Sequence, residues 1–597
     1  MSEPTAPESK PAPQSGPSPE TRPSPGRSFL IADCGATNTT VALFDVVEGE
    51  HRLIARASAP TTTTPPWEGI MVGINQAIVR LSEISGRPLL TEDGELISPP
   101  EPSGAGVDIF GATISVAPPL QVLIAGLLED VSVASARRAI QTVYAEEVDT
   151  FSMADDRDEQ GQVQAILRHR PDIILLTGGT DGGDDSRLRT LAETVEMGVQ
   201  LLPAGERPHV LFAGNRDMRP AFVSLLGSKT NTDVADNVRP SLDKEMLADA
   251  VRIIDKLYQE LKIAAVPGIE DVVELSDYPP RATARAFATM IDYFAALYEG
   301  RVMGVDLGSG SVTLAMADAE GSKLYVRSNR GVGRALEQVW LEATRVEQLL
   351  RWLPYAHAAE SVEAFVRDRA LHPYSVPTAR EELLIEQALV RHILRGVVQE
   401  AGESWSWPEG GSVAPPFQRL ILRGRALTNT PRPGQTVLMA LDALQPTGVF
   451  SVAIDRYSVI PALGMLAPHE PLAVVQILEG GALVEMGWVV APSGRGEPGQ
   501  NALRVVVESE EQDRLEMNVA SGALEVLPLA PGVAARVRLE PERPFDVGAG
   551  PGRAREVDVS GGAAGLVIDA RGRPLRLPRD DEARRDLVQE WRWALGG

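Results

Sequence analysis

The sequence predicts an α/β protein of two similar domains that face each other across a cleft, followed by a small all-β domain. A pattern of apolar strand, Asp-x-Gly turn and apolar strand occurs twice, in IADCGATNTTVALFD and in MGVDLGSGSVTLAMAD. Each copy opens a run of three strands that helices follow. After Pro471 the chain changes to short β-type runs broken by glycine and proline. A chain of 597 residues is also too long for a single core.

The first half of the chain holds a tail and the first domain. Residues 1–27 carry eight prolines and few apolar residues, which predicts a disordered tail. Residues 28–300 form the first predicted domain, in which 52–60 is the third strand and 69–86 is a helix that ends at a glycine. We expect helical insertions in this domain, because 118–146, 244–264 and 281–299 have mostly helical patterns.

The second half holds the other three segments. Residues 301–470 form the second predicted domain, with helical stretches at 334–353 and 379–401 and a closing helix at 455–467. Residues 471–578 form the β-rich domain, in which AVVQIL is counted as the first β-type run. Residues 579–597 form a charged terminal helix.

Composition limits the classes of partner. The net charge of −25 argues against nucleic acid, since phosphate backbones are bound by basic surfaces. No apolar run is long enough to span a membrane, and the N-terminus lacks the apolar stretch of a secretory signal. Cys34 is the single cysteine, which fits a reducing compartment and a packing role. The sequence therefore predicts a cytoplasmic protein.

The two hairpin turns have the composition of phosphate-binding loops. Glycine removes the Cβ that blocks a ligand, and successive loop N–H groups bind anions. The candidate loop residues are Gly35, Ala36, Thr37, Asn38 and Thr39 in the first copy and Gly308, Ser309, Gly310 and Ser311 in the second. Asp33 and Asp306 end their strands, where carboxylates hold Mg²⁺ or orient a water, so both are candidate metal and catalytic residues. A single copy is equally an ordinary turn, whereas two copies indicate a nucleotide between two domains.

A third loop, TGGTDGGDD, follows a buried strand. Loops at the carboxyl edge of an α/β sheet are where ligands bind, which makes Gly178, Gly179 and Asp181 candidate site residues. Asp184 and Asp185 are further candidates for contact with Mg²⁺ or a substrate. The alternative is a turn that caps the helix beginning at Ser186. The AGNRD segment after the next strand presents Asn215 and Asp217 in the same way.

The paired hairpins resemble the superfamily of sugar and acetate kinases, heat-shock chaperone ATPases and actin, whose domains have a ribonuclease H-like fold. In that superfamily the two hairpins are the phosphate loops, and a later glycine-containing loop contacts adenosine. By resemblance, ILRGRALTN supplies the adenosine loop, with Gly424 and Arg425 as its contacts. The resemblance thus implies ATP and Mg²⁺ as cofactors.

A closer resemblance covers roughly residues 28–470. The segments DCGATNTTVALFD, PDIILLTGGTDGG, AGNRD, ADNVRP and DRYSVIPALGMLA are similar to the glutamate mutase L (MutL) family, an actin-like ATPase family named from genes beside cobalamin-dependent glutamate mutase. This resemblance implies an accessory, reactivating chaperone whose partner is a cobalamin-dependent mutase subunit. The chain lacks the Asp-x-His-x-x-Gly signature of cobalamin binding, so we expect no direct contact with cobalamin.

The second loop departs from the family pattern. The family usually has Asp-Ile-Gly-Gly-Ala-Thr-Thr-Asp, whereas here Thr313 is followed by Leu314 in place of the final aspartate. A lost carboxylate affects hydrolysis more than binding, which leaves a slow ATPase as one outcome. Two other functions stay open. One is a sugar or small-acid kinase with Asp181 as base, and the other is a nucleotide-free scaffold for protein partners.

Overall fold

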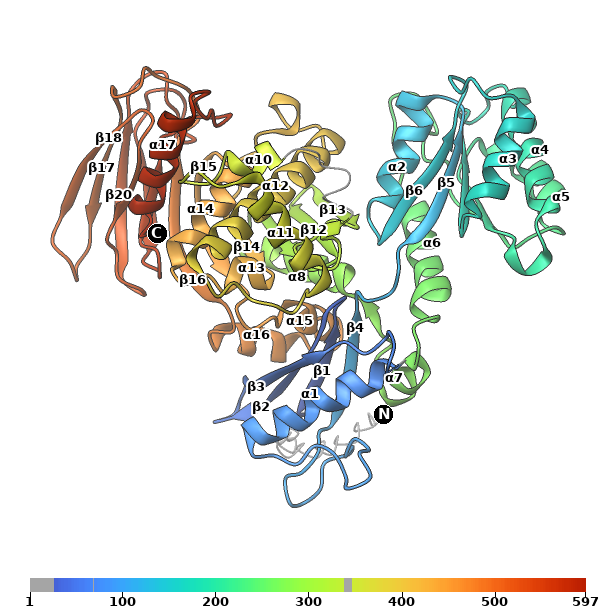
Figure 1. The fold of residues 1–597 in the computed structure, drawn as a ribbon, viewed down its shortest axis with the longest axis horizontal. Helices are drawn as coiled ribbons and strands as arrows, with labels where there is room; N and C mark the ends of the chain where they lie inside the picture. The colour runs from blue at the N-terminus through green and yellow to red at the C-terminus, as the bar shows by residue number, and fades with distance from the viewer. Residues whose placement is uncertain (1–25, 68, 338–345, 597) are drawn as a thin grey trace, which may run out of the picture.

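In the computed structural model, which describes residues 26–67, 69–337 and 346–596, the first hairpin lies at the centre of a mixed sheet (Figure 1). We call this sheet, with the helix α1 that covers it, domain I. Strands β1 and β2 are antiparallel, β3 lies beside β2, and β4 and β10 run parallel to β1. The elements are β1 (Phe29–Cys34), β2 (Asn38–Val47), β3 (Glu50–Pro60), α1 (Ile70–Ser85), β4 (Ile109–Ile114) and β10 (Arg281–Ala282). The tail expected at 1–27 lies outside the described residues except for Gly26 and Arg27.

The second hairpin builds a sheet with the same strand order, which we call domain II. Its order β13-β12-β11-β14-β15 matches β3-β2-β1-β4-β10 in domain I, with the hairpin antiparallel and β14 and β15 parallel to β11. The strands are β11 (Val302–Leu307), β12 (Ser311–Asp318), β13 (Gly321–Ser328), β14 (Arg419–Arg423) and β15 (Gly448–Ile454). This repeated topology confirms the prediction of two similar α/β domains.

The two domains meet along a pair of crossed helices, α8 (Thr283–Leu297) and α15 (Ile460–Leu466). Each helix follows the last strand of its domain's shared pattern, β10 or β15. Gly464 lies where they cross, and a Cβ built on it would lie 1.9 Å from the backbone oxygen of Ala286. Only glycine therefore allows this approach.

The insertion between β4 and β10 contains helices, as expected at 244–264, but the mostly helical interpretation of 118–146 missed a strand. It holds a parallel sheet in the order β6-β5-β7-β8-β9, with helices on both sides, and Figure 1 shows it as a lobe apart from domain I. The apolar run at 120–126 is a strand because a strand buried on both faces has no alternation that distinguishes it from a helix. The elements are β5 (Leu120–Gly126), α2 (Ala134–Ile140), β6 (Ala145–Phe151), α3 (Glu159–His169), β7 (Ile173–Thr177), α4 (Ser186–Leu201), β8 (His209–Phe212), α5 (Arg219–Leu226), β9 (Thr232–Val234), α6 (Ala248–Tyr258) and α7 (Ile269–Leu275).

The C-terminal region is β-rich, but its strands belong to two sheets. β16, β22 and β19 extend the sheet of domain II beyond β15, and β18-β17-β20-β21 forms a separate antiparallel sheet. Apolar side chains of both sheets share one core, to which Val490 and Ile568 contribute from the first and Val505 and Val537 from the second. The strands are β16 (Val484–Ala491), β17 (Asn501–Glu508), β18 (Leu515–Ala520), β19 (Leu524–Leu527), β20 (Ala534–Pro541), β21 (Arg555–Ser560) and β22 (Leu566–Asp569).

The run AVVQIL is helical rather than β-type. It lies in α16 (Pro471–Glu479), which begins at a proline, a residue favoured in the first helical turn. Its buried side chains Ala473, Val474 and Ile477 have helical spacing, which the β-type interpretation overlooked. The other helices are α10 (Val346–Leu350), α11 (Ala359–Leu371), α12 (Arg380–Ser404), α13 (Arg425–Thr428), α14 (Pro433–Leu444) and the expected terminal helix α17 (Asp581–Ala594).

Part of the helix expected at 334–353 lies outside the described residues, namely 338–345. Among the residues that the structure describes, no helix combines the length and apolar character needed to cross a bilayer.

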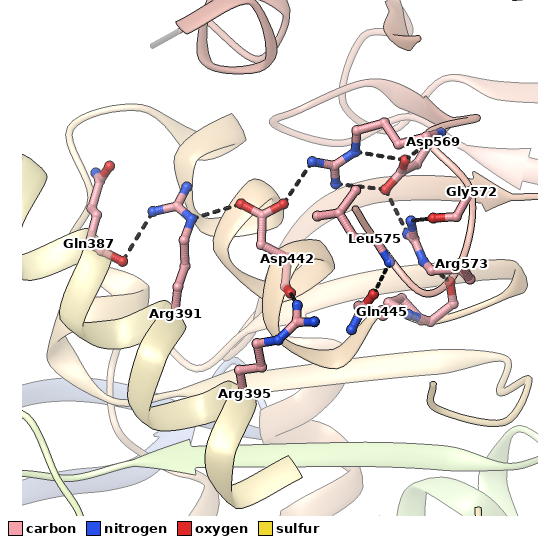
Figure 2. A network of polar contacts seen from close by, with 11 residues as sticks. Gln387, Arg391, Arg395, Asp442, Gln445, Asp569, Gly572, Arg573 and Leu575 are labelled. Atoms are coloured by element: carbon pink, nitrogen blue, oxygen red, sulfur yellow. Dashed lines mark hydrogen bonds and ion pairs between the residues drawn. The ribbon is translucent and has the colours of Figure 1, made fainter. Parts of the chain in front are cut away.

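A buried network of ion pairs joins the C-terminal strands to domain II (Figure 2). Asp442 on α14 accepts hydrogen bonds at 2.7 Å from both Arg391 on α12 and Arg571, which follows β22. Arg571 and Arg573 in turn donate to Asp569. Burial opposes the charged form of Asp569, but the two arginines hold the pKa of its carboxyl well below its ordinary value. Paired charges thus tie the end of β22 to the helices that cover domain II.

Candidate functional site

A cavity of about 400 Å³ lies between the two domains, within the size range of small-molecule sites. The turns of both hairpins line it, as do the loops after β14 and β15. The predicted site residues that it brings together are Asp33, Gly35, Ala36, Thr37, Asn38, Asp306, Gly308, Ser309, Gly310, Ser311, Gly424 and Arg425. The repeated Asp-x-Gly pattern therefore corresponds to two loops that line one cavity.

The two hairpin turns have the same backbone geometry. The N–H of Gly35 donates to the carbonyl of Asn38 at 3.0 Å, and the N–H of Gly308 donates to the carbonyl of Ser311 at 2.9 Å. The loops also touch directly, because the hydroxyl of Thr37 donates to Ser309 Oγ at 2.6 Å. The turns thus form matching halves of one site.

An arginine lies between the two candidate metal ligands. Arg423, the last residue of β14, forms hydrogen-bonded ion pairs with Asp33 and with Asp306, one through each terminal nitrogen. Its Nε lies 3.6 Å from Asp455. Burial opposes the charge of Arg423, but the neighbouring carboxylates, Asp306 first, raise the pKa of the guanidinium above its ordinary value. For the carboxyl of Asp306, burial is the main effect and raises the pKa above its ordinary value.

The residues present do not fit a metal ion shared by Asp33 and Asp306. A shared Mg²⁺ needs oxygen atoms from both carboxylates, and here both face the guanidinium of Arg423. Among the described residues, no group of three or more His, Cys, Asp or Glu side chains is arranged to hold a metal. The donor set therefore disagrees with the metal role expected for this pair of carboxylates.

The loop after β14 lines the cavity at the predicted adenosine position. Gly424 has a φ of +109°, and a Cβ built there would lie 2.0 Å from the backbone oxygen of Leu307. Arg425 donates to the carbonyl of Ser375 at 3.0 Å, which fixes its side chain along the cavity wall. The glycine thus lets the loop lie directly against the end of β11.

Four cavity arginines, Arg423 among them, and the carboxylate of Asp455 beside it were missed from the sequence. Arg56 on β3 and Arg456 after β15 line the cavity and have no ion pair or hydrogen bond within the described part of the chain, whereas Arg369 pairs with Glu386 at 2.8 Å. Asp455 accepts from the backbone N–H groups of Val459 and Ile460. An aspartate just before a helix start was the available signal for Asp455, but isolated arginines carry none.

The comparisons with known proteins agree with the predicted resemblance. The model of the family described as MutL protein matches residues 29–481, which is most of the chain. This chain belongs to the MutL protein family. Protein MutL of Clostridium tetanomorphum is 25% identical over 499 residues, which cover 76% of this chain and 98% of that protein.

Solved structures give weaker likenesses. A glycerol dehydratase reactivase is 12% identical, with a TM-score of 0.29, and covers 74% of this chain and 100% of its own. Nucleotide-free acetone carboxylase is 10% identical, also with a TM-score of 0.29, and covers 83% and 81%. At these scores the assignment to the MutL family rests on the family model and not on the structures.

In this MutL family member the TGGTDGG loop lies on the insertion, away from the residues that line the cavity. The backbone oxygen of Gly179 and the carboxylate of Asp181 accept from Asn237, and Gly178 packs beside Leu127. Burial acts to raise the pKa of Asp181, but hydrogen bonds from Asn237 and from the Arg216 N–H lower it on balance. Three predicted site residues therefore hold loops of the insertion together.

Two other expectations concern local packing. Asp184 accepts from the N–H and the hydroxyl of Ser186, which supports the capping alternative for that loop. Thr39 is fully buried and its hydroxyl lies 3.1 Å from that of Thr61, so it does not line the cavity. Cys34 is also buried, and burial raises the pKa of its thiol, consistent with a packing role.

Proposed function

We propose that this protein binds a nucleotide in the cavity between domains I and II and uses it to control how the domains meet. The observation that carries the proposal is the direct contact of two matching turns from two domains of equal strand order. A ligand whose phosphates lie between such turns contacts both domains at once. Its binding energy then depends on their relative position, which is the requirement for coupling a ligand to a conformation.

The proposed contacts follow from the lining residues. Backbone N–H groups of the two turns form anion-binding concavities. The guanidinium groups of Arg56 and Arg456, which have no ion pair with another described residue, supply positive charge. The loop of Gly424 and Arg425 would hold the nucleoside. Hydrogen-bond donors of this kind bind phosphate whether or not hydrolysis follows. This distinction matters because the chain has Leu314 where the family pattern has an aspartate.

We further propose that the protein is an accessory, chaperone-type factor for a cobalamin-dependent mutase. Membership of the MutL family supports this role, since the family takes its name from genes beside such a mutase. The kinase alternative is less well supported, because its candidate base, Asp181, lies on the insertion and does not line the cavity. The scaffold alternative predicts that no nucleotide binds.

Calorimetric titration of the full chain with ATP tests the proposal. We expect one ATP per chain, and we expect Arg456→Ala to weaken binding by about 10- to 100-fold, because a charge-assisted hydrogen bond contributes ~1.5–3 kcal/mol. Gly308→Val should abolish binding, since a Cβ at that position already lies 3.1 Å from the Ser311 backbone oxygen.

Arg504→Ala is the matched control, because Arg504 is a partly exposed arginine of the C-terminal sheet that pairs with Glu516 and Glu540. It should leave ATP binding unchanged. An absence of heat with the wild-type chain would favour the scaffold. If ATP binds, stimulation of phosphate release by a small hydroxylated substrate, rather than by a mutase subunit, would favour the kinase.

A further inference from the structure

The side chain of Arg423 joins three carboxylates from three strand ends. Asp33 is the second-last residue of β1 in domain I, Asp306 holds the same position in β11 of domain II, and Asp455 follows β15. The side chains are nearly closed to solvent, with exposed fractions of 11% for Arg423, 10% for Asp33, 9% for Asp306 and 0% for Asp455. The cluster thus spans the boundary between the domains.

Almost every carboxylate oxygen in the cluster has a partner. Asp33 Oδ1 accepts from the hydroxyls of Thr113 and Thr283 at 2.8 and 3.0 Å, and its other oxygen accepts from Arg423. Both oxygens of Asp455 accept backbone N–H groups at the start of α15, at 2.8 and 2.9 Å.

The remaining oxygen of the three carboxylates is Asp306 Oδ1. It is buried and, within the described part of the chain, has no hydrogen-bond partner. One free oxygen is compatible with a water molecule but not with a cation held jointly by both hairpins.

The guanidinium supplies what a divalent cation would supply at this position. It places positive charge between two carboxylates, one from each domain, that would otherwise repel each other. Its donors are fixed in one plane, so that one terminal nitrogen faces each carboxylate. Since it extends from β14 of domain II to Asp33 of domain I, it also links the two domains through an ion pair.

We propose that Arg423 is a built-in cation that replaces a metal ion between Asp33 and Asp306, so that the cavity binds nucleotide phosphates without a metal shared by the two carboxylates. The second part of this inference rests on the proposed nucleotide function, whereas the first concerns the carboxylates alone. The two parts are therefore tested by separate measurements.

The first measurement is Mn²⁺ binding to the full chain without nucleotide. Binding is detected as a loss of the electron paramagnetic resonance signal of the free ion. Wild type, Asp33→Asn and Asp306→Asn should bind equal amounts of Mn²⁺. Arg423→Gln should gain one site, which the double variant Arg423→Gln/Asp33→Asn loses again. A wild-type site that disappears in Asp33→Asn would overturn the proposal, as would a folded Arg423→Gln variant that gains none. If Arg423→Gln does not fold, the comparison of wild type with the two asparagine variants decides.

The second measurement is ATP binding by the wild-type chain in EDTA and in excess Mg²⁺. We expect dissociation constants that agree within about threefold, because the internal guanidinium is present in both conditions. Binding that requires Mg²⁺ would overturn the second part of the inference but leave the proposed function standing. Failure to bind in either condition would overturn the proposed function, and the Mn²⁺ comparison would then decide on the built-in cation alone.

Discussion

Asp442→Asn is expected to lower the free energy of unfolding by about 3–5 kcal/mol, the cost of removing one partner from a buried ion pair. The side chain of Asp442 is 2% exposed and serves Arg391 and Arg571, which are 4% and 0% exposed. An amide of the same size fills the space but leaves these two guanidinium groups with less compensating charge. Because Arg571 follows β22, the C-terminal strands should detach from domain II early in unfolding. Urea denaturation followed by tryptophan fluorescence measures both effects, with Trp591 as a reporter beside Arg571.

The control for this substitution is again Arg504→Ala, which removes ion pairs on the surface of the same region. Side chains of this pairing are 27–45% exposed, so solvent screens their interaction and we expect a loss below about 1 kcal/mol. Equal losses from Asp442→Asn and Arg504→Ala would show that burial does not set the importance of the network in Figure 2.

Gly424→Ala is expected to cost on the order of 3 kcal/mol and to disrupt the nucleotide cavity. Two effects add. A side chain at a φ of +109° is strained by ~1–2 kcal/mol, and a Cβ placed 2.0 Å from the Leu307 backbone oxygen forces the ends of β11 and β14 apart. Because Arg423 and Arg425 flank this glycine, both cavity contacts should shift with it. Thermal unfolding reports the first effect, and ATP titration reports the second.

Gly522→Ala separates strain from collision. Gly522 also has a positive φ, +95°, but a Cβ there would meet no atom within 4 Å. Its loss of stability should be limited to about 1 kcal/mol, with ATP binding unchanged. If Gly424→Ala were no worse than Gly522→Ala, the close approach of β14 to β11 would not be needed for the fold.

Local patterns in the sequence predicted correctly those elements whose structure depends on residues adjacent in the chain. The helix at 69–86 is α1, and its end at Gly86 has the left-handed backbone that a glycine signal predicts. The strand before the TGGTDGGDD loop is β7, and the helix after it is α4. The family assignment is confirmed for the same reason, because its motifs are short and local.

In the insertion and the C-terminal region, local patterns did not predict every element correctly. The strand at 120–126 and the helix at 471–479 were assigned to the wrong class, since short apolar runs fit both. Nor do β-type runs indicate which sheet they join. β16 and β22 extend domain II while β17 and β20 form another sheet, and this choice is made by cores shared between distant segments.

The sequence by itself determined that two Asp-x-Gly hairpins exist, that each opens a domain of similar pattern, and to which family the chain belongs. These conclusions rest on residues adjacent in the chain. Only the tertiary structure decided what the two aspartates face, because Arg423 is far from both in sequence and reaches them through the parallel pairing of β14 with β11. An ion pair between separate strands leaves no periodic trace in a sequence. The two carboxylates therefore had the composition of a metal site, while the fold places a guanidinium between them.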